Sequence, residues 1–305
     1  MKLVWSRRYD VDLFGHVFPV EKYRLVRQEV LARGIAAEED LVEAEPATAE
    51  DLLLVHTPEY IDDLLNLRTT PRTMRSEMAL TREIVDAYIA TAGGSIETGR
   101  RALEDGVCVH IGGGYHHAFP DHAEGFCYLN DVAIAVAKLK HDGEVDRVCV
   151  IDCDLHQGNG TAFFFARDPD VFTFSMHQEN NYPLKQRSDF DIGLPDGADD
   201  TIYLRELEAI GDILDHHVPD MVLYLAGADP YLEDRLGGLA VTKPGLRKRD
   251  EFVFNQCSVR KIPVAVVFAG GYALDVKDVV DIHIATILEA GRMARLTQQP
   301  PHGGR

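Results

Sequence analysis

The stretch "RVCVIDCDLHQGNG", residues 147–160, joins an apolar run to a group of polar side chains. The run over 147–151 shows no alternation of polarity, which is typical of a parallel strand covered on both faces. Asp152, Asp154 and His156 alternate after it, so an extended continuation of the strand would point all three to one side. The stretch therefore predicts a buried strand that presents ligand-type side chains at its carboxyl end.

Four further apolar runs resemble this strand. They cover residues 107–111, 171–174, 221–226 and 264–268. Amphipathic helical patterns lie among these runs, over residues 78–103, 129–141, 201–216 and 244–260. Alternating strands and helices are the pattern of a doubly wound parallel sheet. Because no linker interrupts the chain, we expect one α/β domain over residues 1–296 and a disordered tail over 297–305.

Polar and glycine-rich motifs follow each of the five apolar runs. They read "GGGYHHA", "DCDLHQGNG", "SMHQENNYP", "GADPY" and "AGGYA". Ligands of open α/β sheets bind in the crevice outside the carboxyl ends of the strands. Motifs that are far apart in the chain should therefore meet in one pocket.

A catalytic metal site is the favoured interpretation of the acidic residues. Asp229 in "GADP" adds a carboxylate from a second strand end to Asp154 and His156. A mixed set of His and Asp without a thiolate suits a catalytic divalent ion with an open coordination position. The alternative is a hydrogen-bonded strand end or a helix cap, because Asp is a frequent N-cap residue. Closely spaced carboxylates are costly without a neutralising cation, which favours the metal.

Two histidines and a tyrosine are candidates for the chemistry beside this metal. His116 and His117 follow three glycines, which permit close approach of the backbone to a ligand, and we interpret them as proton-transfer groups. A second pair, His216 and His217, ends a helical pattern and is expected at the surface. Tyr272 could donate a hydrogen bond to a developing oxyanion, or could equally be a packed residue after a turn. Together these groups predict metal-assisted hydrolysis of an amide or related acyl bond.

Composition limits the ligands and the compartment. A formal net charge of -19 disfavours binding to nucleic acid. No apolar run approaches the roughly 18 residues of a membrane span, and the N-terminus lacks the apolar segment of a signal peptide. The five cysteines, an odd number without a C-x-x-C pair, indicate a reducing compartment. We therefore expect a cytoplasmic protein that binds neither nucleic acid nor membranes.

The motifs resemble those of the zinc-dependent histone deacetylase superfamily, which includes bacterial members that act on acetylated polyamines. Matching segments run through most of the chain, from "GHVFPVEKYRLV" and "HTPEYIDDL" to "GFCYLND", "SMHQ" and "AGGY". The resemblance implies an arginase-like fold with a mostly parallel sheet of about eight strands and helices on both faces. It also implies a catalytic Zn²⁺ at the carboxyl ends of the strands.

The resemblance also assigns roles to individual residues. The zinc ligands would be Asp154, His156 and Asp229. His116 and His117 would be the general acid/base pair, and Tyr272 would be the oxyanion donor. Asp152 would accept a hydrogen bond from His116 and hold its tautomer. Asn159 is counted among the catalytic groups, although many family members have an aspartate there, paired with the second histidine. His117 would then lack an anionic partner, and its imidazolium would be less stabilised.

A substrate tunnel and structural cations follow from the same resemblance. An aromatic tunnel for a linear acyl-lysine side chain would involve Gly114, Gly125, Phe126 and Tyr182. A structural monovalent cation, usually K⁺, is expected near Asp152, Asp154, His156, Ser175 and Met176, and a second near Phe165, Asp168 and Val171.

The favoured function is a zinc-dependent deacylase that acts on acetyl-lysine in a protein or peptide, or on a similar linear amine such as an acetylated polyamine. A ureohydrolase would need two Mn²⁺ ions and further ligands, and the single ligand set argues against it. A catalytically silent acyl-lysine binding module would not need Tyr272 or the two histidines. The substrate class, the acyl-chain length and the oligomeric state stay open at this point.

Overall fold

A parallel sheet of eight strands forms the centre of the computed structural model, which describes residues 1–298. The strand order is β2-β1-β3-β8-β7-β4-β5-β6, and every pair of neighbours is parallel. The strands are β1 (Leu3–Val4), β2 (Leu41–Val42), β3 (Val107–His110), β4 (Val148–Asp152), β5 (Val171–Gln178), β6 (Phe190–Leu194), β7 (Met221–Leu225) and β8 (Val264–Val267). The expected α/β fold around a parallel sheet is confirmed.

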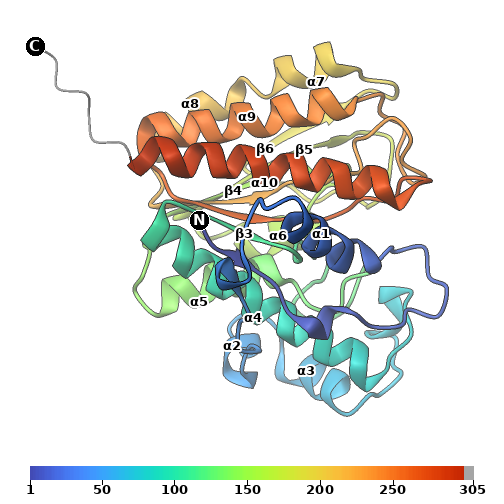
Figure 1. Ribbon diagram of the computed structural model, residues 1–305. Helices are drawn as coiled ribbons and strands as arrows, with labels where there is room; N and C mark the ends of the chain where they lie inside the picture. The colour runs from blue at the N-terminus through green and yellow to red at the C-terminus, as the bar shows by residue number, and fades with distance from the viewer. Residues whose placement is uncertain (299–305) are drawn as a thin grey trace, which may run out of the picture.

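Helices cover both faces of this sheet (Figure 1). On one face α9 and α10 pack against each other, with α7 and α8 beside α9, and on the other face α4 packs against α5. The α-helices are α1 (Glu21–Ala32), α2 (Ala49–Leu53), α3 (Pro58–Leu65), α4 (Arg82–Asp105), α5 (Asp131–His141), α6 (Asn159–Phe165), α7 (Asp200–Glu206), α8 (Ala209–His217), α9 (Lys243–Arg260) and α10 (Val276–Gln298).

The central strands are wholly buried and end at the same level. Every residue of β3, β4, β7 and β8 is buried, as their continuous apolar sequences predict. Asp152 at the end of β4 is in register with Leu225 at the end of β7, and Leu225 is in register with Val267 at the end of β8. The loops after these three strands therefore start side by side.

Some elements differ from the sequence prediction. The strands β1 and β2 have two residues each, and β6 is an edge strand with exposed positions, so none of them shows a long apolar run. The helix predicted over 201–216 is divided into α7 and α8, and the apolar periodicity continues through the break because both segments pack against α9. The expected disordered tail over 297–305 is wrong for Thr297 and Gln298, which form the end of α10, and its residues 299–305 lie outside the described residues.

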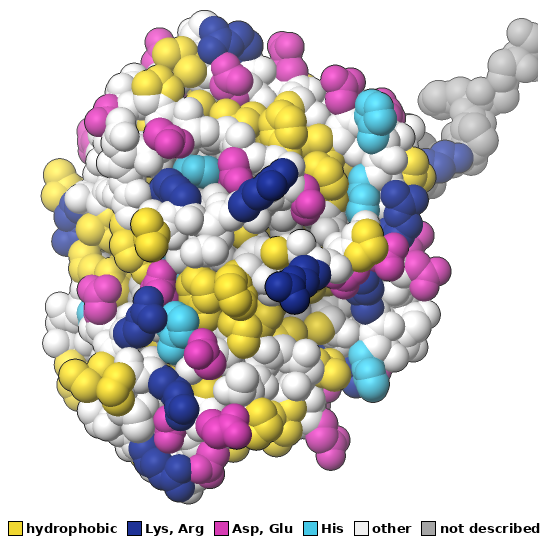
Figure 2. All heavy atoms as spheres, turned by 180° about the vertical axis from the view of Figure 1, so that it is seen from behind, with side chains coloured by type: hydrophobic (Ala, Val, Ile, Leu, Met, Phe, Trp, Pro, Cys, Tyr) yellow, Lys and Arg dark blue, Asp and Glu magenta, His cyan; other side chains and the backbone are white. Residues whose placement is uncertain are grey.

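The surface mixes charges of both signs with apolar side chains. Seen from behind, acidic and basic groups are interleaved across the molecule, without a continuous basic surface among the described residues on this face (Figure 2). None of the helices in residues 1–298 is long and apolar enough to cross a membrane.

The buried, neutral side chain of His56 hydrogen-bonds to the residue that precedes α5. His56 Nδ1 is 3.0 Å from the carbonyl oxygen of Phe119, and His56 Nε2 accepts a hydrogen bond of 3.2 Å from the backbone N–H of Asn130. Asn130 in turn caps α5. Because Nε2 is used as an acceptor, a second proton on this ring would break the contact. Burial accordingly lowers the pKa of His56 to about 4.

This histidine should make folding stability depend on pH. Between pH 6.5 and about 4 the unfolded chain binds a proton at His56 that the folded chain does not, so acidification in this window destabilises the fold. We expect His56→Gln to reduce the slope of unfolding free energy against pH by up to about 1.4 kcal/mol per pH unit. The exposed His141 gives the control variant His141→Gln. Denaturant titrations across this range check both, and equal slopes in all three proteins would contradict the assignment.

Candidate metal centre and active site

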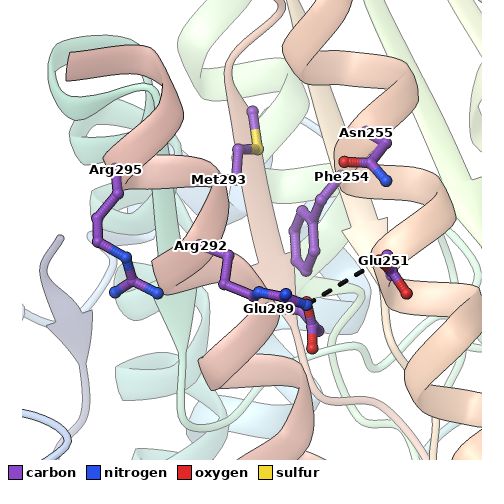
Figure 3. A pocket seen from close by; sticks show the side chains of 7 residues that line it. All are labelled: Glu251, Phe254, Asn255, Glu289, Arg292, Met293 and Arg295. Carbon is purple, nitrogen blue, oxygen red and sulfur yellow. Dashed lines mark hydrogen bonds and ion pairs between the residues drawn. The ribbon is translucent and has the colours of Figure 1, made fainter. Parts of the chain in front are cut away.

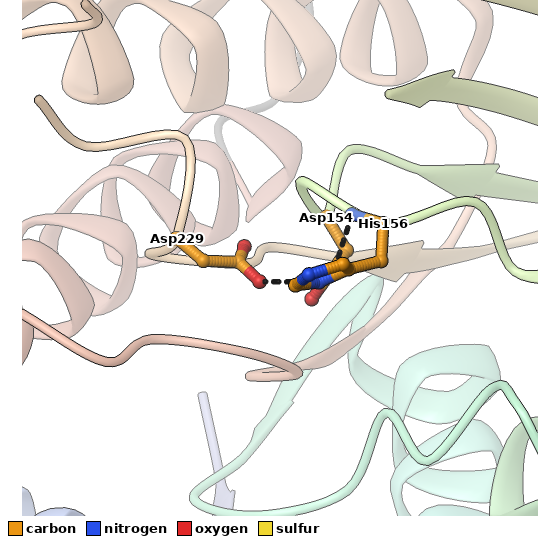
Figure 4. Close-up of side chains that lie close together, drawn as sticks. All are labelled: Asp154, His156 and Asp229. Atoms are coloured by element: carbon orange, nitrogen blue, oxygen red, sulfur yellow. Dashed lines mark hydrogen bonds and ion pairs between the residues drawn. The ribbon is translucent and has the colours of Figure 1, made fainter. Parts of the chain in front are cut away.

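Asp154, His156 and Asp229 lie together in the loops that follow β4 and β7 (Figure 4). Their candidate ligand atoms lie within 4.8 Å of one another, and all three residues are buried. His156 Nδ1 is 3.3 Å from Asp154 Oδ1 and 3.3 Å from Asp229 Oδ2. Oδ2 of Asp229 is buried and has no hydrogen-bond partner. A buried carboxylate oxygen that lacks a hydrogen-bond partner and lies beside an imidazole and a second carboxylate fits a divalent cation.

The chain turns after β4, whereas the alternation in the sequence predicted an extended continuation. Asp152 Oδ1 accepts a hydrogen bond of 3.1 Å from the backbone N–H of Asp154, and Asp154 Oδ1 accepts one of 2.9 Å from that of His156. Such side-chain to backbone bonds two residues along stabilise a turn. As a result Asp154 and His156 face Asp229, while the Oδ2 atom of Asp152 reaches His116.

Backbone N–H groups join the loops after β4, β7 and β8 through the metal-site carboxylates. The N–H of Leu155 donates to Asp229 Oδ1 at 3.0 Å, and the N–H of Gly270 donates to Asp154 Oδ2 at 2.7 Å. A Cβ atom at Gly270 would lie 2.0 Å from Asp229 Oδ2. Only glycine permits this close approach, so the "AGGY" loop contributes to the geometry of the metal site.

The two adjacent histidines form one hydrogen-bonded pair behind this site. His116 Nδ1 is 2.7 Å from Asp152 Oδ2, and the two Nε2 atoms of His116 and His117 are 3.1 Å apart. His117 Nδ1 is 2.8 Å from Asn159 Oδ1. The first ring thus has a carboxylate partner, and the second has an amide.

The pKa values of the two imidazoles are shifted in opposite directions. Burial lowers the pKa of His116, but the charges of Asp152 and Asp154 outweigh it and raise the pKa to about 9. Burial and the charge of His116 lower the pKa of His117 well below its usual value. Near neutral pH the pair therefore combines a protonated and a neutral ring, which are a proton donor and a proton acceptor.

Asp131, the first residue of α5, holds the loop that carries the histidines. Its carboxylate accepts hydrogen bonds from the backbone N–H groups of Gly114 at 3.1 Å and Tyr115 at 2.7 Å, and from the Ser95 hydroxyl at 2.5 Å. A buried carboxylate with these donors fixes the path of the glycine-rich segment. The N–H of Gly114 is consequently engaged within the protein, and the residue lines the inner end of the pocket.

Tyr272 lines the same cavity as the two histidines. Its backbone N–H donates to Asp234 Oδ2 at 2.6 Å, and its ring packs edge-on against Phe18 and Phe126, with centroid distances of 5.9 Å and 6.1 Å. Burial and the charge of Asp229 raise the pKa of the phenol well above its usual value. The hydroxyl therefore keeps its proton and remains a hydrogen-bond donor.

A pocket of about 190 Å³ leads to these groups. Its wall consists of Glu77, His117, Gly125, Phe126, His156, Asn181, Tyr182, Leu236 and Tyr272. The structure thus brings the expected tunnel residues Gly125, Phe126 and Tyr182 together with His117, His156 and Tyr272. The sequence analysis did not name Glu77, Asn181 or Leu236. Glu77 and Leu236 lie in loops outside the quoted motifs, and Asn181 lies within "SMHQENNYP" but carries no signal of its own.

Two buried cations lie behind the acidic cluster, and neither was predicted. Lys22 Nζ donates to the carbonyl oxygen of Ala269 at 2.7 Å, and burial lowers its pKa to about 8 despite the nearby carboxylates. Arg249 pairs with Asp250 and donates to the carbonyl oxygen of Gly227 at 2.5 Å. Burial and repulsion by Asp154 still raise the pKa of Asp229 to about 7, so the carboxylates lack full compensation without a bound cation.

The second histidine pair, outside the pocket, only partly follows its expected surface placement. The surface placement of the second histidine pair is correct for His216 and wrong for His217. His217 is buried, packs against Phe172 and has Nε2 3.1 Å from the carbonyl oxygen of Val148.

Asp168, which was named for a second K⁺ site, has its carboxylate oxygens 2.7 Å and 2.8 Å from Lys140 Nζ. The second K⁺ site stays a prediction.

A second groove, of about 340 Å³, lies between α9 and α10 (Figure 3). Its charged groups compensate one another, because Arg292 Nη1 is 2.9 Å from Glu289 and 4.0 Å from Glu251. Arg247 adds a further contact of 2.7 Å to Glu289. The groove contains no histidine or cysteine among its lining residues, which gives it no chemistry comparable to the first pocket.

Comparisons with known proteins agree with this geometry. The profile of the histone deacetylase domain matches residues 16–287. An uncharacterised protein of Picosynechococcus is 42% identical, over 88% of this chain and 90% of its own. Histone deacetylase 2 of Arabidopsis thaliana is 28% identical, over 89% of this chain and 74% of its own. The crystal structure of an HDAC homologue from Aquifex aeolicus is similar with a TM-score of 0.80 and 25% identity, over 95% of this chain and 84% of that chain.

The three-residue cluster predicts how metal affinity responds to substitution. Asp229→Asn keeps the shape of the side chain but removes its charge, and we expect zinc affinity to fall by more than about tenfold. Asp234→Asn is the matched control, because this buried carboxylate is close by but outside the cluster. Competition with a chromophoric chelator measures both affinities. Equal losses in the two variants would show that general charge, and not ligation by Asp229, governs binding.

Proposed function

Because this chain belongs to the histone deacetylase family and is a hydrolase of amide bonds, we propose that it is a zinc-dependent deacylase. Its substrate would be acetyl-lysine in a protein or peptide, or a similar N-acetylated linear amine. The observation that carries the proposal is the buried cluster of Asp154, His156 and Asp229, in which Oδ2 of Asp229 has no hydrogen-bond partner. Two members of this cluster, Asp154 and His156, line one cavity together with the histidine pair and Tyr272.

Asp154, His156 and Asp229 would hold the zinc ion. A zinc ion bound there supplies a Lewis acid for a carbonyl oxygen and a water molecule in the pocket. The low pKa of His117 keeps its ring neutral and able to accept a proton, while His116 carries the proton shared with Asp152. This pair would remove a proton from the attacking water and return one to the leaving amine.

Tyr272 would stabilise the oxyanion that forms from the substrate carbonyl. Its phenol keeps its proton, so it can donate a hydrogen bond to a developing negative charge. Packing against Phe18 and Phe126 restricts the ring before substrate arrives. Such preorganisation favours the transition state over the ground state.

The side chains that line the pocket favour a linear, cationic substrate. Aromatic rings of Phe126, Tyr182 and Tyr272 line it, which suits an apolar methylene chain. Glu77 is the acidic residue among the lining side chains, and its charge would favour an amine-containing substrate. Both acetyl-lysine and an acetylated polyamine have this chemistry.

Other expectations remain proposals. A structural K⁺ near Asp152 and Ser175 and a cytoplasmic location follow from the resemblance and the composition. A ureohydrolase would require a second metal, and the described residues hold a single cluster of three candidate ligands. A binding module without catalysis would leave the paired histidines and the protonated phenol without a role.

Acetate release from two substrates tests the proposal directly. An acetyl-lysine peptide and an acetylated polyamine are compared with zinc-loaded and chelator-stripped protein. We expect zinc-dependent turnover of at least one of them, and the faster substrate identifies the class. Absence of turnover on both, with one zinc bound per chain, would favour the binding module or a different acyl group.

The role of Tyr272 gives a sharper prediction. Tyr272→Phe removes only the hydroxyl, so we expect kcat to fall by about a hundredfold, with zinc content unchanged. Tyr231→Phe, on the loop after β7 and outside the pocket wall, should keep nearly normal kcat. Steady-state acetate release and zinc analysis of the purified variants provide the measurement. Nearly normal kcat in Tyr272→Phe would refute the oxyanion role.

A further inference from the structure

A chain of polar contacts extends from His117 away from the metal. His117 Nδ1 is 2.8 Å from Asn159 Oδ1, and Asn159 Nδ2 donates to Glu124 Oε1 at 2.8 Å. Glu124 Oε2 accepts a hydrogen bond of 2.5 Å from Arg75 Nη2. Asn159 is buried, and the Glu124 side chain is 12% exposed. These contacts join the start of α6 to the loops that precede α4 and α5.

We propose that Glu124 is a positioning residue for His117 and acts through Asn159, an inference that rests on the proposed function. A carboxylate can only accept hydrogen bonds, so the NH₂ group of Asn159 must face Glu124. The amide oxygen of Asn159 is then forced to face His117. That orientation would not be determined if Asn159 contacted His117 alone.

The orientation of Asn159 determines the tautomer of His117. An amide oxygen accepts a hydrogen bond, so Nδ1 of His117 must carry the proton. The lone pair of the neutral ring then lies on Nε2, which is the atom 3.1 Å from His116 Nε2. If the amide turned over, its NH₂ group would face Nδ1 and favour a proton on Nε2. His117 could then no longer accept a proton at that atom.

Glu124 also supplies the negative charge that is missing at position 159. The resemblance to the family implied that His117 would lack an anionic partner, because many members have an aspartate at the position of Asn159. In the structure the charge lies one hydrogen bond further away, at Glu124. Its backbone is fixed by reciprocal hydrogen bonds with Cys127, of 3.0 Å and 2.8 Å, around the turn that carries Gly125 and Phe126. Arg75 holds the carboxylate from the outer side.

Glu124→Gln tests this arrangement, because glutamine is nearly isosteric and can donate as well as accept. In the zinc-loaded protein we expect kcat to fall by about tenfold with KM within about twofold of wild type. Glu144→Gln is the matched control, since Glu144 also pairs with an arginine, Arg100, at 2.8 Å, and lies in the loop before β4. A change in KM alone, or a control effect of the same size, would overturn the proposal.

A double-mutant cycle distinguishes the action of Glu124 on His117 through Asn159, here called the relay, from a general structural effect. In an Asn159→Ala background, Glu124→Gln should change kcat by less than about twofold, because the connecting amide is absent. Combining Glu124→Gln with Asn159→Asp should recover most of the lost kcat, since the introduced carboxylate would accept directly from His117 Nδ1. Additive losses or a failure of this rescue would contradict the relay.

The tautomer of His117 can also be determined in the absence of substrate. In ¹⁵N-histidine-labelled, zinc-loaded protein, the nitrogen chemical shifts of His117 should show a proton on Nδ1, and Glu124→Gln should add the Nε2-protonated form. This readout remains valid if neither acetylated substrate is hydrolysed, so it distinguishes failure of the relay from failure of the deacylase proposal. An unchanged tautomer in Glu124→Gln would overturn the inference.

Discussion

The candidate site depends on the hydrogen bonds that the carboxylate of Asp154 accepts from two neighbouring loops. This carboxylate accepts hydrogen bonds from the backbone N–H groups of His156 at 2.9 Å and Gly270 at 2.7 Å, and so joins the loops after β4 and β8. Asp229 makes the equivalent connection from the loop after β7 by accepting from Leu155. Parallel strands that end at one level bring these loops together, and the carboxylates then determine their paths. The candidate metal ligands Asp154 and Asp229 are therefore also the side chains that determine the paths of these loops.

Buried negative charge is the cost of this arrangement. Burial raises the pKa of Asp229 to about 7 and that of Asp234 to about 6, which shows that these carboxylates are poorly compensated without a bound cation. Two buried cations, Lys22 and Arg249, donate to backbone carbonyl oxygens of the loops at Ala269 and Gly227. A divalent ion would complete the compensation, so metal binding should contribute to the stability of this edge of the sheet.

The histidine pair shows how partners outside the pocket can assign different roles to similar groups. His116 contacts a carboxylate directly, whereas His117 contacts one through the amide of Asn159. The charges of Asp152 and Asp154 raise the pKa of the first ring against the effect of burial, whereas burial and the charge of His116 lower the pKa of the second ring and leave it neutral. The indirect contact restricts the tautomer of that neutral ring. At position 159 an amide therefore contacts His117, and the carboxylate of this chain of contacts lies one hydrogen bond further away, at Glu124.

The sequence alone determined the buried strands, the parallel α/β class and the position of the polar motifs at the strand ends. Those features depend on local periodicity and on a general property of parallel sheets, so Asp154, His156, Asp229 and Tyr272 could be named together in advance. Only the tertiary structure decided which side chains pair. The turn after Asp152, the contact of Glu124 with Asn159 and the burial of Lys22 beneath Ala269 each depend on loops from distant parts of the chain. No periodicity encodes these contacts, because they arise from packing between segments and not from the conformation of either segment.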